Sequence, residues 1–153
     1  MKTDDSRETK IKGKMTFNFT KQETFDIGNV EGHILSLRKA EGKNISIGKP
    51  EFMDGAYAVN FSFDDLVKGN GPHQGYSTLT KNGDSVVTKW EGKIITILTA
   101  AGIPIPSFEG TMEWIKATGQ YEGMQGKGHY KGHFSSETSY DVEWEGEYWH
   151  RRQ

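Results

Sequence analysis

The sequence predicts an all-β protein, a single eight-stranded antiparallel up-and-down β-barrel. Apolar and polar residues alternate with period two in most segments, which gives each expected strand one buried face and one wet face. The composition, with 19 glycines and 12% aromatic residues, suits a strongly curved sheet around a core of rings rather than a helical bundle. Strands joined by short turns close most naturally into a barrel, since closure removes the sheet edges; a two-layer sandwich is the alternative.

Length and charge limit the organisation and the partners of the chain. The 153 residues suit one domain over residues 11–153, preceded by a charged segment at 1–10 that we expect to be a disordered tail. The formal net charge of -2 predicts no binding to nucleic acid. The sequence contains no cysteine for a disulfide, a thiol nucleophile or a thiolate metal site, and no secretory signal, so we expect a cytoplasmic protein.

Three strands are expected in the N-terminal part of the chain. Apolar residues alternate over residues 15–27, which predicts one long strand or two collinear strands with a bend near residues 20–22. A second strand is expected at residues 32–38, followed at 40–49 by a connection rich in Gly and Lys that holds at most a weak edge strand. Residues 57–63 alternate again, and we expect their aromatic side chains to point into the barrel.

The pair Asn82-Gly83 predicts a tight hairpin. Both residues tolerate the positive φ angles that a type I′ turn requires. The pairs that this turn sets opposite each other are Leu79 with Val86, Ser77 with Thr88, and Gly75 with Trp90.

A nearly uncharged segment at residues 94–105 interrupts the alternation. Pro104 and Pro106 exclude a central strand here, because proline cannot donate a ladder hydrogen bond. At about a dozen residues the segment is also too short to span a bilayer. Because an exposed apolar segment promotes association, we expect either a lid over the barrel mouth or a subunit interface. We favour the interface, and therefore expect a homo-oligomer that forms through residues 94–105.

The C-terminal strands are expected at residues 107–114, 120–134 and 139–149, with turns at 117–119 and 134–138. On one face of the last hairpin the expected pairs are Lys131 with Asp141, His129 with Glu143, and Lys127 with Glu145. On the other face they are Gly132 with Tyr140, Tyr130 with Val142, and Gly128 with Trp144. One face is therefore a ladder of opposite charges in water, and the other is a buried band of rings and glycines.

Several segments resemble a known group of barrels. The run Phe108-Glu109-Gly110-Thr111 with Trp114, and residues 119–130, are similar to the closing strands of the allene oxide cyclase barrel-like group, small calycin-like barrels of which many are bacterial. Residues 69–76, with Gly83-Asp84 and Trp90-Glu91-Gly92, resemble the middle of the same group. The resemblance covers residues 57–149 and implies an eight-stranded barrel. The plant enzyme that names the group cyclises an unsaturated fatty-acid epoxide inside its barrel, which implies an interior site here.

Polar residues in phase with the expected buried face are the candidates for chemistry. Glu23 follows the phase of Phe19 and Phe25, and His33 follows the phase of Leu35. A carboxylate and an imidazole on an apolar wall have shifted pKa values and can act as a catalytic acid and base. The alternative interpretation places both at the rim of the barrel, in water. The candidate ligand-binding residues are Tyr57, Phe61, Ser77, Thr88, Trp90, Trp114, Tyr130, Tyr140 and Trp144.

The sequence leaves three functional hypotheses open. The leading one is a barrel that binds a small apolar or aromatic molecule in an enclosed cavity on the order of several hundred Å³. The second is a cofactor-free isomerase or cyclase that acts on an unsaturated small molecule through Glu23, His33 or a tyrosine. The third is a structural or interaction barrel with a filled core. We expect no cofactor. We also expect no metal site, since His129 and His133 lie about 13 Å apart along a strand, too far to share an ion.

Overall fold

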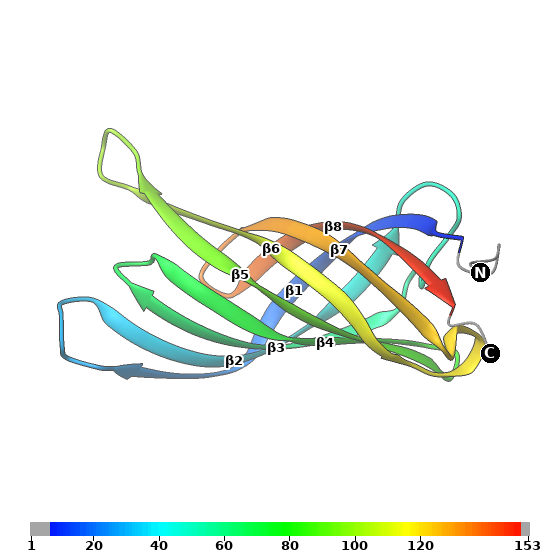
Figure 1. The fold of residues 1–153 in the computed structure, drawn as a ribbon. Coiled ribbons are helices and arrows are strands. Elements are labelled where there is room, and N and C mark those ends of the chain that lie inside the picture. Colours follow the sequence, from blue (N-terminus) through cyan, green and yellow to red (C-terminus); the bar gives the residue numbers. More distant parts are fainter. Residues whose placement is uncertain (1–6, 151–153) are drawn as a thin grey trace.

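The computed structural model describes residues 7–150 and shows eight antiparallel strands closed into one barrel (Figure 1). The elements are β1 Thr9–Asp26, β2 His33–Ser46, β3 Tyr57–Val67, β4 Gly71–Lys81, β5 Asp84–Leu98, β6 Pro104–Ala117, the short 3₁₀ helix η2 Gly119–Tyr121, β7 Met124–Phe134 and β8 Ser139–His150. Each strand pairs with the next, and β8 pairs with β1, so the predicted fold class is confirmed. β1 begins inside the expected tail at 1–10, of which residues 1–6 lie outside the described residues.

The expected bend in the first strand is confirmed. A β-bulge interrupts the pairing of β1 with β2 between Phe19 and Lys21. Because a bulge adds one residue to one strand, it inverts the alternation that follows it. Phe17 is therefore buried before the bulge, whereas Glu23 and Phe25 face solvent after it, and Phe25 is 58% exposed.

The second strand is longer than predicted. β2 continues through most of the 40–49 segment that was expected to be a connection, and it pairs with β1 as far as Ser46. Gly42 makes this pairing possible, because a Cβ atom at that position would collide with the backbone carbonyl oxygen of Thr16 on β1. In the sequence this glycine indicated a loop, but in the structure it allows two strands to approach closely.

The inward face of β3 is the opposite of the predicted one. Tyr57 and Phe61 lie on the outer face, 49% and 50% exposed, while the small residues Ala58 and Asn60 point inward. Large rings on other strands and in the β2–β3 loop already fill the interior, so β3 must contribute small side chains there. The alternation was correct, but alternation alone does not tell which face is buried.

The two predicted hairpins differ in outcome. The β4–β5 pairs are confirmed, and Asn82 and Gly83 have φ angles of 51° and 84°. The β7–β8 register is wrong by two residues: Lys131 faces Glu143, His129 faces Glu145, Lys127 faces Glu147, Tyr130 faces Trp144, and Gly132 faces Val142. The turn is displaced by one residue, because Phe134 pairs with Tyr140 instead of belonging to the turn. A shift of two residues leaves every side chain on its face, so the charge ladder survives with different partners.

The segment at 94–105 belongs to a long hairpin. β5 continues to Leu98, and Pro104 and Pro106 lie within β6 opposite Leu98 and Thr96, so the expected interruption is wrong. β6 pairs with β7 only from Ser107 onward, which leaves one edge of β6 free at the prolines. This hairpin projects beyond the barrel together with the β1–β2 and β3–β4 hairpins (Figure 1).

A loop closes the end of the barrel that carries both termini. Phe52, in the loop between β2 and β3, is 1% exposed and packs edge-on against Trp114 and Trp144, with ring centroids at 6.1 and 5.8 Å. The Asn44 amide holds this loop by donating to the carbonyl oxygens of Phe52 and Met53, at 3.2 and 3.0 Å. The interior is therefore accessible from the other end, where the hairpins project.

Candidate functional site

Two connected spaces lie at the open end of the barrel. The inner cavity has a volume of about 60 Å³ and is lined by residues of most strands, so it is far smaller than the predicted enclosed cavity. A wider groove of about 680 Å³, here called the vestibule, lies between the projecting hairpins. Arg38, Ile94 and Phe134 line both spaces and therefore form their junction. The other vestibule residues are Leu66, Lys68, Gly69, Thr96, Pro104, Pro106, Ser136 and Glu137.

Most of the predicted ligand-binding residues lie on the inner cavity. Those that line it are Ser77, Thr88, Trp90, Tyr130, Tyr140 and Trp144. Trp114 is buried, but it packs against Phe52 and does not reach the cavity. Tyr57 and Phe61 lie on the outside of the barrel and take no part in the site.

The two candidate catalytic residues are not brought together. Glu23 is exposed on β1, opposite Leu37 on the outer surface. His33 lies at the start of β2, where its ring nitrogens contact the Asn29 amide oxygen at 2.5 Å and the Asp65 carboxylate at 2.6 Å. Neither residue lines the inner cavity or the vestibule. The alternative interpretation of both as rim residues fits the structure.

An ion pair between Arg38 of β2 and Asp64 of β3 is the main feature that sequence reasoning missed. The guanidinium donates to the Asp64 carboxylate, and the two side chains are 15% and 1% exposed. The guanidinium carbon also lies 4.6 and 5.7 Å from the ring centroids of Phe19 and Phe134. Within residues 7–150 nothing accepts a hydrogen bond from the buried Nε–H of Arg38. A charged donor without an acceptor thus lies at the junction of the two spaces.

The burial of this pair shifts the titration of its acid. Desolvation raises the pKa of Asp64, and the adjacent Arg38 guanidinium opposes that shift by favouring the carboxylate. A signal for the pair exists in the sequence, because Arg38 and Asp64 share their phase with the small residues Ala40 and Ser62. On β2 and β3 the small side chains mark the inner face, because large rings of other strands fill the barrel, whereas we assigned the inner face of these two strands to their large residues.

A histidine and a tyrosine form the second polar group of the inner cavity. His73 of β4 lies with Nε2 2.9 Å from the Tyr130 hydroxyl, and its ring packs edge-on against Trp90 with centroids at 4.8 Å. Burial, aided by the charge of Arg38, lowers the pKa of His73 to about 4, so the imidazole is neutral at pH 7. Burial also raises the pKa of Tyr130, which keeps the phenol protonated.

An amide completes the polar wall. Asn60 of β3 donates to the Tyr140 hydroxyl at 2.7 Å and accepts from the indole N–H of Trp90 at 2.9 Å. These bonds lock both rings, so the wall is rigid and its polar atoms are largely satisfied. The arrangement offers apolar rings, a neutral imidazole–phenol pair and one free guanidinium donor. Among the residues that the structure describes, no group of three His, Cys, Asp or Glu side chains is placed to hold a metal ion.

No protein-family model matches the chain, and no curated protein matches it significantly. Within residues 7–150, no helix is long and apolar enough to cross a membrane.

Proposed function

We propose that this protein binds a small apolar or aromatic molecule at the open end of its barrel, with an oxygen of the ligand held by Arg38. The observation that carries the proposal is the buried Arg38 Nε–H, which has no acceptor among the described residues and belongs to a residue that lines both the inner cavity and the vestibule. An unsatisfied buried donor costs about 1–3 kcal/mol, and a ligand oxygen that accepts its hydrogen bond removes this cost. The rings of Phe19 and Phe134 offer apolar surface beside that oxygen.

The volumes of the two spaces favour a ligand that lies mainly in the vestibule. The inner cavity of about 60 Å³ suits only a small polar group, whereas sites for drug-sized ligands measure roughly 300–1,000 Å³. The vestibule of about 680 Å³ falls in that range. The apolar body of the ligand therefore occupies the vestibule, and its polar end reaches Arg38. Membership of the allene oxide cyclase barrel-like group is a separate proposal, supported by the resembling segments and by closure of eight strands.

Calorimetric titration with a matched pair of ligands tests this proposal, and tryptophan emission reports occupancy because Trp90 lines the inner cavity. The pair is an aromatic carboxylic acid and a hydrocarbon of the same shape. We expect saturable binding, at least about tenfold tighter for the acid, since a hydrogen bond to a charged group contributes about 1.5–3 kcal/mol. The double variant Arg38→Met/Asp64→Val removes the donor without leaving a lone buried charge, and it should lose this preference.

Tyr57→Phe is the matched control, because Tyr57 lies on the outer face and the substitution should leave both affinities unchanged. Absence of saturable binding for both compounds would contradict the proposal. That result, together with the small inner cavity, would favour the third hypothesis, an interaction barrel with a filled core.

The His73–Tyr130 contact favours a second candidate function, a cofactor-free isomerase or cyclase. A neutral imidazole beside a protonated phenol can accept a proton from a bound unsaturated molecule at one point and return it at another. For this function we expect the wild-type protein to convert a ligand found in the titration. Tyr130→Phe should abolish the conversion, while the affinity of this variant for the ligand stays within about threefold of wild type. Conversion that survives both Tyr130→Phe and His73→Gln would exclude this mechanism.

A further inference from the structure

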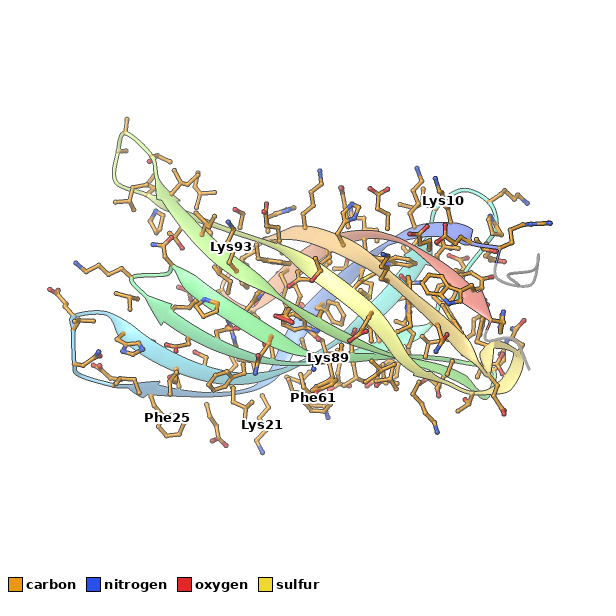
Figure 2. The ribbon with its side chains drawn as sticks, viewed as in Figure 1. Lys10, Lys21, Phe25, Phe61, Lys89 and Lys93 are labelled. Atoms are coloured by element: carbon orange, nitrogen blue, oxygen red, sulfur yellow. The ribbon has the colours of Figure 1, made fainter. Side chains whose placement is uncertain are left out.

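The outer face of β1–β5 carries two parallel rows of side chains that run across the strands. The lysine row contains Lys21, Lys39, Phe61, Tyr76 and Lys89, each directly opposite the next in the strand pairing. The glutamate row, two residues further along each strand, contains Glu23, Leu37, Phe63, Gln74 and Glu91. In Figure 2, Lys21, Phe61 and Lys89 lie together along the lower side of the barrel. The two rows have the same strand order but opposite charge.

The centre of this face is apolar and exposed. Leu37, Phe61, Tyr76 and Phe63 are 56%, 50%, 48% and 40% exposed, and they lie on the adjacent strands β2, β3 and β4. The charged residues flank them on β1 and β5, apart from Lys39, whose Nζ lies 5.9 Å from the Phe61 ring centroid. An apolar centre with a charged rim is the usual anatomy of a protein–protein interface, and a contiguous exposed apolar patch commonly marks one.

At the β1 edge of this face the charges are not balanced across the strand pairing. Lys21 faces Lys39 directly across the β1–β2 pairing, an arrangement that is destabilising on its own. No ion pair between described residues involves a member of either row. On β7 and β8, by contrast, Lys131 faces Glu143 and Lys127 faces Glu147. The β1 edge of the face therefore leaves like charges side by side, whereas at the β5 edge Lys89 lies opposite Glu113 of β6.

We propose that a second copy of this chain covers the outer face of β1–β5 in a two-fold dimer. A two-fold axis that lies in the interface, perpendicular to the strands and midway between the rows, places each residue against the residue two positions away on the same strand of the second copy. Lys21 then meets the second copy's Glu23, Lys89 meets its Glu91, and Phe61 meets its Phe63. Successive residues on one face of a strand are about 6.8 Å apart, so a single placement aligns all of these pairs. A face that is complementary to itself in this way is the requirement for a two-fold interface.

The size and the charge of the face distinguish this partner from others. The five strands are spaced about 4.8 Å apart, so the face is roughly 20 Å wide and gives an interface at the small end of the range for specific complexes. We therefore expect a dimer with a micromolar dissociation constant. A nucleic acid fits poorly, because Glu23 and Glu91 lie beside the lysines and the chain has a formal net charge of -2.

Charge exchange within one strand tests the dimer. Sedimentation velocity of the wild-type protein from about 1 to 200 µM should show a monomer–dimer equilibrium. Lys89→Glu places two carboxylates against each other in both symmetry-related contacts at the β5 end of the interface, and we expect it to weaken the dimer at least tenfold. We expect the same of Glu91→Lys, which places two lysines against each other there. The double variant Lys89→Glu/Glu91→Lys restores opposite charges across the axis and should return the dissociation constant to within about threefold of wild type.

The matched control is Lys127→Glu on β7, which lies across the closed barrel from β3, and it should leave the equilibrium unchanged. A wild-type protein that stays monomeric over the whole range overturns the proposal. So does a dimer that ignores the single charge changes, or one that the double variant fails to restore. Dissociation caused by shortening the β5–β6 hairpin, with no effect of the charge changes, would assign association to residues 94–105 instead.

Discussion

Arg38 and Asp64 show how one residue pair sets the chemistry of the open end. Removing two charges from water costs several kcal/mol per ion, and their mutual attraction offsets this cost only while both are present. Asp64 is 1% exposed, so it depends entirely on the guanidinium for compensation. The pair holds Arg38 in place beside two aromatic rings, while its Nε–H has no acceptor among the described residues. The stability of the barrel and its proposed ligand contact therefore depend on the same side chain.

Removing one member of the pair should cost more than removing both. Arg38→Met leaves a buried carboxylate alone, and we expect it to lower the free energy of unfolding by about 3–5 kcal/mol. In the double variant Arg38→Met/Asp64→Val the loss should shrink to about 1 kcal/mol or less. Urea unfolding of the wild type, both single variants and the double variant measures this coupling. Additive losses in the double variant would contradict it.

His73 makes the stability of the protein depend on pH. Its pKa falls from an ordinary value of 6.5 to about 4 on folding, so between these values the unfolded chain binds a proton that the folded chain does not. The free energy of unfolding should therefore decrease as the pH falls from about 6.5 to about 4, by at most about 3 kcal/mol. The raised pKa of Asp64 acts in the opposite sense near the lower limit. The difference between wild type and His73→Gln isolates the histidine, and equal slopes of the two proteins would refute this assignment.

At the scale of elements, the β2–β3 loop acts as a plug for one end of the barrel. Phe52 contacts Trp114 of β6, Tyr121 of η2, and Trp144 and Tyr148 of β8. The Asn44 amide ties the loop to β2, and its oxygen accepts from the Trp144 indole at 2.9 Å. This closure explains why the interior space is confined to the opposite end.

Truncation of the plug should be among the most damaging single changes. We expect Phe52→Ala to lower the free energy of unfolding by about 3–5 kcal/mol, because it leaves a cavity among rings that cannot collapse onto it. Phe25→Ala is the control, since Phe25 is 58% exposed and should cost less than about 1 kcal/mol. Chemical denaturation compares the two variants. Similar losses for both would mean that the loop does not support the barrel.

At the scale of the whole molecule, the closed sheet and the projecting hairpins have separate roles. Within the barrel, every strand pairs with a neighbour on both sides. The projecting part of the β5–β6 hairpin differs, because β6 has no β7 partner before Ser107. Its tip is apolar: Ile97, Leu98 and Ile103 are 62%, 65% and 60% exposed. The tip therefore adds little to the core, and it suits contact with a ligand or another chain.

Shortening this hairpin should separate the two roles. Replacement of residues 97–105 by Asn-Gly should change the free energy of unfolding by less than about 1 kcal/mol, because the removed side chains are mostly exposed. We expect weaker binding of the aromatic acid, since Pro104 is lost from the vestibule wall. Thermal unfolding and titration measure both effects. A large loss of stability would show that the hairpin belongs to the barrel core.

The sequence by itself determined the features that depend on neighbours along the chain. Period-two alternation predicted the strands, and Asn82-Gly83 predicted a hairpin with its pairs, because pleating and turn geometry are local. Aromatic residues such as Trp90 and Tyr130 were placed correctly on the cavity, since their strands alternate strongly. The count of strands then implied closure.

Only the tertiary structure decided which face of β3 is inside and which polar groups meet. Tyr57 and Phe61 face outward because rings from other elements already fill the barrel, and volume is a property of the whole fold. The contact of Arg38 with Asp64, 26 residues away, and that of His73 with Tyr130, 57 residues away, depend on strand register around the closed sheet. The site thus rests on register and volume, which no local pattern encodes.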